Sequence, residues 1–484
     1  MRKFTMLRRD LLRVLSATGL ANLLPGALRA ANRRKPNFVV FLTDDQKWNV
    51  VGYEGHPLAH TPHIDALAES GVAFRNSFVT TPICASSRAT LFSSTYYAFH
   101  RFNFGTDGLD AGLIPNMFPR LLARAGYRTG LVGKLGIWFN SGVLAALGRS
   151  LGVTSEDAGL FDVYAPVERE PYISEDDNGV RRHSLDKIYR RAVRFLTDQD
   201  PEQPFCLVVA FNVPHITPEM DGQGRYQPAA TEEKLFPDAE VPVSELGDPE
   251  IYENLPDILK QGIMAGDQAE KWSGNDPTNE YVNYFRLVAG ADRVIGGVLD
   301  TLRATGLDED TVVIFTSDNG LSLGDRGLSG KWAHFDESLR VPLVIRDPRN
   351  PAGSGTRPSE FALNVDIAPT ILELAGLAVP ESYQGASLAP FLDAAPPSDW
   401  RREFYCEHEG GFWRIPDWIG IRGHEYKFAE YSGSEQPVFF LTDLKEDPGE
   451  IRNLADDPAY GELLVSLRER AHEYQREYAQ WPGN

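Results

Sequence analysis

The sequence is poor in several features that mark particular protein classes. It has only 3 cysteines in 484 residues, and its 48 Lys and Arg are outnumbered by 68 Asp and Glu. Three cysteines cannot form the dense disulfide framework of a small secreted domain. The formal net charge of −20 repels nucleic acids and anionic membranes. We therefore expect neither as a partner, although a pocket with its own positive charge could still bind an anion.

Long apolar runs are missing too. A bilayer span needs about 20 apolar residues, whereas the stretch at 11–28 is interrupted by Arg, Gly, Asn and Pro. Residues 1–30 combine a basic start, the pair Arg8-Arg9 and small residues near their end, which is typical of a twin-arginine export signal; an amphipathic helix or a membrane anchor is the alternative. Removing them takes away six basic side chains and one Asp, which lowers the net charge from −20 to −25. We expect a soluble mature protein in the periplasm or secreted, without membrane contact.

What the chain does have is a repeated alternation of helical and strand-like patterns. Strand-like runs rich in Val, Ile, Leu and Phe lie at 37–45, 127–134, 204–215, 311–320 and 341–348. Helical patterns alternate with these runs along the chain. This alternation is typical of a mostly parallel sheet that is covered by helices on both faces. We predict an α/β fold.

The pattern changes after about residue 400. Alternating aromatic runs at 417–431 and 436–444 precede a helical pattern from about Ala459 to Ala479, which indicates a small antiparallel sheet plus a helix. The proline-rich stretch 393–403 separates the two parts. We predict an α/β domain over 36–392 and an α+β subdomain over 400–484. The polar segment 216–280 is either a functional covering loop or a plain insertion.

Three predicted strands end in polar residues. These ends are Asp44-Asp45, the segment from Asn212 to His215, and Asp318-Asn319. Ligands of an open parallel sheet bind outside the carboxyl ends of its strands, so these groups could converge. Their oxygen atoms suit Ca²⁺ or Mg²⁺ rather than zinc. Each pair alone could be a helix cap or a turn; together they predict a metal site.

Cys84 stands in an unusual setting, TPICASSRATLFSS at 81–94. A buried thiol or half of a disulfide would be the ordinary interpretation. Cys206 lies in the apolar run PFCLVVAF and is expected to act as a small buried hydrophobe, whereas Cys406 is ambiguous. A disulfide between Cys206 and Cys406 is a minor alternative.

Six motifs, in order over roughly 37–460, resemble those of the type I sulfatases of the alkaline-phosphatase-like superfamily. CASSRATLFSS is similar to the signature C-x-P-S-R-x-x-L-x-T-G, TPHIDALAESGVAFRNSF to the T-P-N-I-D-x-L-A block, AGYRTGLVGK to the block that ends in a functional lysine, and NVPHITP to the P-H-x-P block. SDNGLSLGDRGLSGKWAHFDESLRVPLVIR and LTDLKEDPGEIRNLADDP match the two others.

The resemblance implies a chemical role for Cys84. A formylglycine-generating maturase would oxidise it to Cα-formylglycine, whose hydrated aldehyde attacks sulfur with one hydroxyl and later expels sulfate with the other. The implied ligands of Ca²⁺, or of Mg²⁺ as the alternative, are modified Cys84, Asp44, Asp45, Asp318 and Asn319.

The resemblance also implies roles for four cationic side chains. Arg88 would hold the hydrated aldehyde, and sulfate oxygens would be bound by Lys134, His215 and Lys331, of which His215 or Lys331 would protonate the leaving group. Without the resemblance, Lys134 would be taken as a solvated charge and His215 as a structural histidine. Lys331 would be taken as a surface partner of Asp336 or Glu337.

The sequence departs from the family pattern at three positions. Ser86 stands where Pro or Ala is usual, which could slow conversion of Cys84. Gly136 stands where the G-K-x-H block has a histidine that helps to release sulfate, and loss of a positioned base costs about 10²- to 10⁴-fold. Arg326 stands where His is common and adds a charge that could meet a substrate anion. By composition alone, the possible replacements for the missing base are His56, His60, His63 and His100.

The expected function is hydrolysis of a sulfate ester or sulfamate, on a sulfated carbohydrate or a small sulfate ester. The carbohydrate is inferred by analogy with exported enzymes of this kind. Two alternatives stay open: an inactive sulfatase-like protein that binds glycans, and a phosphodiesterase or phosphonate monoester hydrolase on the same scaffold.

Overall fold

The computed structural model describes residues 35–140, 159–167, 172–175, 179–217, 225–237, 239, 244–260, 279–410 and 415–480. The predicted export signal at 1–30 lies outside the described residues, as does part of the segment 216–280. Among the residues described, no helix is both long and apolar enough to span a membrane.

A seven-stranded sheet forms the centre of the molecule, in the order β2-β14-β11-β1-β10-β5-β7. Strand β1 pairs in parallel with β10 and β11, β5 pairs in parallel with β10 and β7, and β14 and β2 are antiparallel at one edge. The predicted mostly parallel sheet is therefore confirmed. The strands are β1 (Asn37–Thr43), β2 (Val72–Ala73), β5 (Arg128–Gly133), β7 (Val163–Pro166), β10 (Phe205–Ala210), β11 (Thr311–Ser317) and β14 (Leu343–Arg346).

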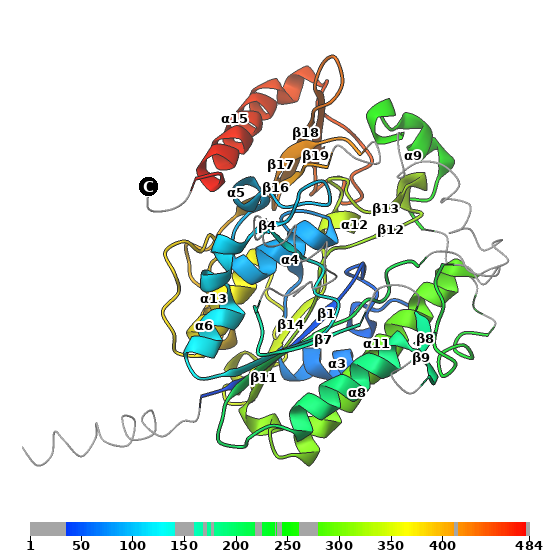
Figure 1. Ribbon diagram of the computed structural model, residues 1–484. Helices are drawn as coiled ribbons and strands as arrows, with labels where there is room; N and C mark the ends of the chain where they lie inside the picture. Colours follow the sequence, from blue (N-terminus) through cyan, green and yellow to red (C-terminus); the bar gives the residue numbers. More distant parts are fainter. Residues whose placement is uncertain are drawn as a thin grey trace, which may run out of the picture.

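Helices cover both faces of this sheet (Figure 1). Strand β1 shows why, because its side chains alternate: Phe38 and Val40 belong to one buried cluster, and Val39 and Phe41 to the other. The first face packs against α4 (Cys84–Ser93), α6 (Phe118–Arg124), α13 (Ile367–Leu374) and α14 (Ala389–Leu392). The second face packs against α3 (Pro62–Ser70), α8 (Ser184–Thr197) and α11 (Glu280–Ala304).

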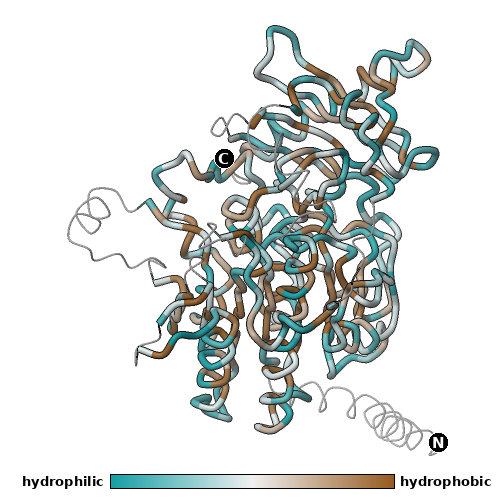
Figure 2. Tube along the Cα trace, turned by 90° about the vertical axis from the view of Figure 1, so that its right-hand side faces the viewer, coloured by the Kyte–Doolittle hydropathy of each residue, from teal (hydrophilic) through white to brown (hydrophobic). Residues whose placement is uncertain are grey.

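The C-terminal part is an antiparallel sheet with one long helix, as predicted. Its strands run in the order β16 (Glu403–His408), β17 (Trp418–Gly423), β18 (Tyr426–Tyr431) and β19 (Val438–Asp443). One face packs on α15 (Gly461–Tyr478) through Leu467 and Ala471. The other face joins a cluster that includes Phe78 and Leu339 of the α/β body. Figure 2 shows apolar stretches along the chain in both the α/β body and the C-terminal part.

Short elements complete the described fold. The short strands pair two by two, β3 (Asn76–Phe78) with β15 (Phe361–Leu363), β4 (Leu109–Asp110) with β6 (Phe139–Asn140), β8 (Ile173–Glu175) with β9 (Arg181–His183), and β12 (Ser322–Leu323) with β13 (Ser329–Gly330). The short helices are α5 (Tyr97–His100), α9 (Pro249–Asn254) and α12 (Asp336–Leu339). All three cysteines are buried and free, so the minor alternative of a Cys206–Cys406 disulfide is wrong: these two residues lie in separate sheets.

Candidate active site

Neighbouring parallel strands bring the predicted polar residues to one edge of the sheet. Asp44 follows β1, Asp318 follows β11, and Lys134 follows β5. The strand ends are tied together, since the backbone N–H of Asp44 donates to the Val213 carbonyl and that of Asp318 to the Thr43 carbonyl, both at 3.1 Å. This edge is where ligands of parallel sheets bind.

The five predicted metal ligands, Cys84 among them, meet at this edge and are buried. The Asp45 backbone N–H lies 3.1 Å from Asp318 Oδ1, and Asn319 Nδ2 donates to Asp45 Oδ1 at 2.7 Å. One ligand atom each from Asp44, Cys84 and Asp318 can be chosen so that all lie within 4.8 Å of one another. A cation placed between them would therefore be in reach of several oxygen atoms and the Cys84 side chain.

Two unpaired atoms test whether these residues fit a cation. Asp44 Oδ1 and Asn319 Oδ1 are both buried and accept no hydrogen bond from any described residue. A buried acceptor without a partner is costly and calls for an explanation. Both atoms are hard oxygens of the kind that Ca²⁺ and Mg²⁺ prefer, so the residues present fit a hard divalent cation.

Three cationic side chains surround the carboxylates. Arg88 is fully buried, and its Nε donates to Asp318 Oδ2 at 2.7 Å. The Nζ atoms of Lys134 and Lys331 are paired with Asp44 Oδ2 and Asp45 Oδ1, respectively. The surface pairing considered for Lys331 is thus not what the structure has, because this lysine is buried inside the site.

These charges set the protonation of the two neighbouring carboxyl groups. Burial alone would raise the pKa of Asp44, but the surrounding cations, first among them Lys134, hold that pKa well below its usual range. Burial and the Asp44 carboxylate together raise the pKa of Asp318 to about 6. The site thus holds one strongly anionic carboxylate beside one that is more easily protonated.

The pKa values of His215 and Lys331 shift in opposite directions. Burial lowers the pKa of His215 to about 4, and its Nδ1 donates to the Ile216 carbonyl at 2.8 Å, so Nε2 faces Asp45 Oδ2 at 3.6 Å. Burial also disfavours the charge of Lys331, but Asp45 and the other carboxylates raise its pKa above the usual value. Lys331 is therefore a stable positive charge, whereas His215 is neutral at neutral pH.

Cys84 is the first residue of α4, and the whole helix is buried. The polar residues of α4 find partners in other elements, since Ser86 Oγ donates to the Phe102 carbonyl at 2.7 Å and Ser87 Oγ accepts from Asn364 Nδ2 at 2.9 Å. Ser86, which departs from the family signature, therefore has a structural partner. A proline or alanine side chain could not make this bond.

The histidines considered as replacements for the missing base have their described contacts elsewhere. His56 stacks on Phe285 of α11 at 4.6 Å. The ring of His63 lies against Gly296 of the same helix. His100 Nε2 bonds to Thr90 Oγ1 at 3.1 Å, and His60 is exposed.

Gly136 itself leaves little room for a side chain. Its φ of +74° lies in the region that favours glycine, and a Cβ there would approach Arg88 Cδ to 2.7 Å. Arg88 and Gly136 are thus packed against each other.

Arg326 does not meet the site, so the expectation that it faces a substrate anion is wrong. The guanidinium is buried, pairs with Glu337 and donates to the Gly449 carbonyl. It also lies 4.0 Å from the ring of Phe335. It holds the α/β body to the C-terminal part.

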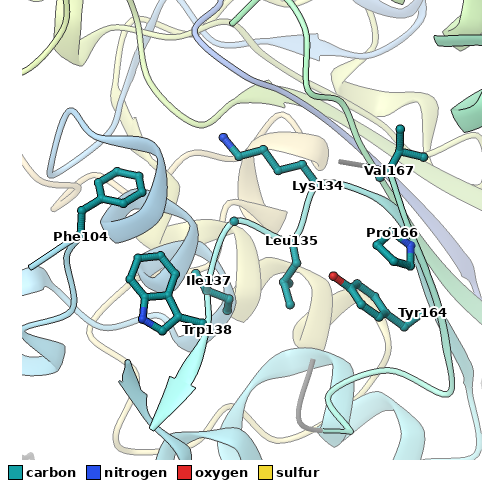
Figure 3. Close-up of a pocket in the computed structure, with 10 residues that line it drawn as sticks. Phe104, Lys134, Leu135, Ile137, Trp138, Tyr164, Pro166 and Val167 are labelled. Atoms are coloured by element: carbon teal, nitrogen blue, oxygen red, sulfur yellow. The ribbon is translucent and has the colours of Figure 1, made fainter. Parts of the chain in front are cut away.

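A pocket of about 320 Å³ opens beside Lys134. Figure 3 shows Phe104 and Trp138 on one side, Tyr164 and Pro166 on the other, and the Lys134 side chain at the top. Ligand pockets commonly begin at about 300 Å³ and are lined mainly by apolar and aromatic groups. This pocket therefore offers room for a single small ring next to the charged centre.

The profile of the sulfatase family matches residues 36–377, and that of the C-terminal part of N-sulphoglucosamine sulphohydrolase matches residues 324–477. The chain belongs to the sulfatase family. Among curated sulfatases, the N-acetylglucosamine-6-O-sulfatase of Bacteroides thetaiotaomicron is 26% identical over 92% of this chain and 87% of that protein.

Solved structures of the superfamily share this fold. The structure of a protein in complex with its substrate D-glucosamine-2-N,6-O-disulfate has a TM-score of 0.76 at 23% identity and covers 92% of this sulfatase and 98% of the other chain. The phosphonate monoester hydrolase of Agrobacterium radiobacter has a TM-score of 0.73 at 23% identity, covering 92% and 96%. The predicted alkaline-phosphatase-like architecture is confirmed.

Sequence reasoning did not single out several residues around the site. The aromatic pocket walls come from the segment between α5 and β4, from a segment after β5 and from β7, and nothing in their spacing predicted a shared cavity.

Proposed function

We propose that this sulfatase removes sulfate from O-sulfated or N-sulfated carbohydrates, using formylglycine made from Cys84 and a bound Ca²⁺ ion. The observation that carries the proposal is the pair of unpartnered buried oxygens, Asp44 Oδ1 and Asn319 Oδ1, beside the Cys84 side chain. The proposal includes export by the twin-arginine route.

The ion would be held by Asp44, Asp45, Asp318 and Asn319, where it would neutralise charge on the sulfuryl group and favour ionisation of the attacking hydroxyl. The Arg88 guanidinium donates to Asp318 Oδ2 and to the Lys134 backbone carbonyl. It therefore links the metal ligands after β11 to the end of β5.

The lysines are placed to bind the substrate anion. Lys134 and Lys331 approach the carboxylates from different strands, and both would turn their Nζ atoms to sulfate oxygens when the cation neutralises those carboxylates. Lys331, which carries a proton at neutral pH, would protonate the leaving oxygen or nitrogen, and His215 could do so only after taking up a second proton.

Carbohydrate is favoured as the organic part of the substrate. The B. thetaiotaomicron relative is named an N-acetylglucosamine-6-O-sulfatase, and the substrate in the neighbouring structure is a sulfated glucosamine. The aromatic pocket beside Lys134 supports this class because flat apolar walls suit the face of a sugar ring.

The deciding experiment is mass spectrometry of the tryptic peptide from Asn76 to Arg88, taken from the periplasm of the native host, combined with turnover of sulfated monosaccharides. We expect an aldehyde or hydrate in place of the Cys84 thiol. Turnover should stop with EDTA and return with Ca²⁺, and C84A should lose about 10⁶-fold in kcat, as when other enzymes lose a nucleophile.

Each alternative has its own result in the same experiment. A peptide that alkylates fully as cysteine, with glycan binding but no turnover, would replace the proposal with an inactive glycan-binding relative. Faster hydrolysis of bis(4-nitrophenyl) phosphate than of 4-nitrophenyl sulfate would favour the phosphodiesterase interpretation.

A further inference from the structure

Asp45, one of the predicted metal ligands, has a backbone conformation that is uncommon for a residue other than glycine. Its φ is +67°, which lies in the left-handed region. Asp enters this region more readily than most residues, but the conformation still costs free energy. Residues of this kind persist where the surrounding structure holds them, and they cluster at functional sites. The contacts that hold the Asp45 backbone therefore bear on the site.

The left-handed conformation explains how two consecutive carboxylates reach one site. Successive side chains of a strand point to opposite faces, so a straight continuation of β1 would separate the carboxylates of Asp44 and Asp45. Instead, one ligand atom each from Asp44, Asp45 and His215 can be chosen so that all lie within 4.8 Å of one another. Because φ sets the direction of a side chain relative to the preceding peptide, the positive φ turns the Asp45 carboxylate toward that of Asp44.

The hydroxyl group of Tyr284 is bonded to both ends of the segment 45–47. It donates to the Asp45 carbonyl at 2.7 Å and accepts from the Lys47 backbone N–H at 2.9 Å. Tyr284 is fully buried, and its ring lies edge-on to that of Tyr226, with the ring centroids 5.7 Å apart. Tyr284 belongs to α11, a helix of 25 residues that packs on the central sheet. A long and firmly packed element therefore carries this hydroxyl group.

Ser317 bonds to the middle of the same segment. The Gln46 backbone N–H donates to Ser317 Oγ at 3.0 Å, and Ser317 Oγ donates to the Asn319 carbonyl at 3.0 Å. Hydroxyl groups from α11 and β11 thus hold the segment through its backbone. A shift of this backbone would move the Asp45 carboxylate, with which the Lys331 Nζ is paired.

We propose that Tyr284, with Ser317 as a second contact, is a positioning residue that holds Asp45 in the conformation in which its carboxylate can bind the metal ion. Tyr284 acts through the backbone, because its hydroxyl group bonds to the Asp45 carbonyl and not to the carboxylate. Partners of this kind around a metal site are worth about 10- to 100-fold in metal affinity. The inference rests on the Ca²⁺ site of the proposed function, and it adds that α11, which carries none of the predicted ligands, sets the affinity of that site.

The test measures Ca²⁺ affinity directly. Wild type and Y284F are freed of metal with EDTA, and Ca²⁺ is titrated into each by calorimetry. The substitution removes the hydroxyl group and keeps the ring, so α11 can still pack on the sheet. We expect the Kd for Ca²⁺ to rise about 10- to 100-fold in Y284F. Hydrolysis of 4-nitrophenyl sulfate by Y284F should then need a correspondingly higher Ca²⁺ concentration to reach half of its maximal rate.

The matched control is Y383F, which separates positioning from a general loss of stability. Tyr383 is also buried, and its hydroxyl group donates to the Asn116 carbonyl at 2.7 Å in the cluster on the other face of the sheet. Both variants should lower the Tm, because each leaves a buried backbone group without its partner, but only Y284F should weaken Ca²⁺ binding. An unchanged Kd in Y284F would overturn the proposal. If Y284F does not fold, S317A takes its place: weaker Ca²⁺ binding by S317A supports the proposal, and an unchanged Kd overturns it.

A crystal structure of Y284F keeps the test independent of the proposed function. If wild type binds no Ca²⁺, the proposed function has failed at its metal site, and the structure of the variant then decides the positioning role. An Asp45 backbone that leaves the left-handed region and carries its carboxylate away from Lys331 would support that role. An Asp45 that keeps its φ near +67°, with its carboxylate in place, would contradict it.

Discussion

At the scale of single residues, the active site depends on how each charge is neutralised. Asp44, Asp45 and Asp318 are nearly inaccessible to solvent, and each has a cation beside it, respectively from Lys134, Lys331 and Arg88. Burying a carboxylate is tolerable only with such partners.

We predict that the substitution G136H does not restore the catalytic base that the G-K-x-H block has at this position. An L-residue at φ +74° costs about 1–3 kcal/mol, and the new Cβ would push on Arg88. We expect lower stability in urea and at least about a 10-fold lower kcat, because small displacements of catalytic groups are expensive.

The matched control for G136H is G376H. Gly376 has a φ of +72°, but no heavy atom lies within 4 Å of the position that a Cβ would take there. G376H therefore carries the backbone cost alone and should leave kcat unchanged. Higher activity of G136H than wild type would show that the packing against Arg88 is not limiting.

At the scale of elements, helix α4 shows that a segment of small polar residues need not lie on the protein surface. CASSRATLFS is buried along its entire length, and the hydroxyl groups of Ser86, Ser87 and Thr90 bond to neighbouring elements. The hydrogen bond between Thr90 and His100 ties α4 to the end of α5. Such partners come from α5, the loop after it and the segment near Asn364.

The buried His100 side chain, which bonds to Thr90, predicts that the free energy of unfolding depends on pH. Burial lowers the pKa of His100 to about 3, against about 6.5 in the unfolded chain. The unfolded state therefore binds the extra proton between these values, and stability falls as the pH drops below about 6.5. Between pH 7 and pH 5 the wild type should lose about 2 kcal/mol more than H100N in urea unfolding.

The control substitution is H60N, because His60 is exposed and its replacement removes an imidazole without changing a buried contact. If wild type and H100N lose the same free energy of unfolding over this pH range, the His100 ring is not kept neutral by its burial between α4 and α5.

At the scale of the whole molecule, a buried ionic network joins the α/β body to the C-terminal sheet. Asp336 of α12 accepts from Arg422 at 2.9 Å and from Lys427 at 2.6 Å, and Lys427 also pairs with Glu450 at 2.7 Å. Arg326 and Glu337 lie in the same layer. This network holds the C-terminal sheet against the segment that carries Lys331.

The prediction at this scale concerns Lys427, which is 2% exposed. K427M leaves the Glu450 carboxylate with only the Asp336 backbone N–H and Asp336 with Arg422 as its one cation, and breaking a buried pair in this way costs about 3–5 kcal/mol. We expect a correspondingly lower free energy of unfolding. The control R303A removes an exposed pair with Asp300 and should cost well under about 1 kcal/mol; equal losses in the two variants would contradict a structural role for the network.

The sequence by itself determined the layered α/β fold and the edge at which the site lies. Apolar runs that alternate with helical patterns indicate buried parallel strands. Polar residues that follow such strands must gather at the common carboxyl edge of the sheet. The positions of Asp44 and Asp318 follow from that rule alone.

The tertiary structure decided which side chains meet across long separations in sequence. Arg326 is close in sequence to the site residues but turns into the interface with Glu337. Arg422 and Lys427, far along the chain, pair with Asp336 of α12. Local periodicity reports which face of an element is buried, but not what lies opposite it. Those partners are selected by the packing of the C-terminal sheet on the α/β body, where buried charges and hydrogen-bonding groups must find each other or a ligand.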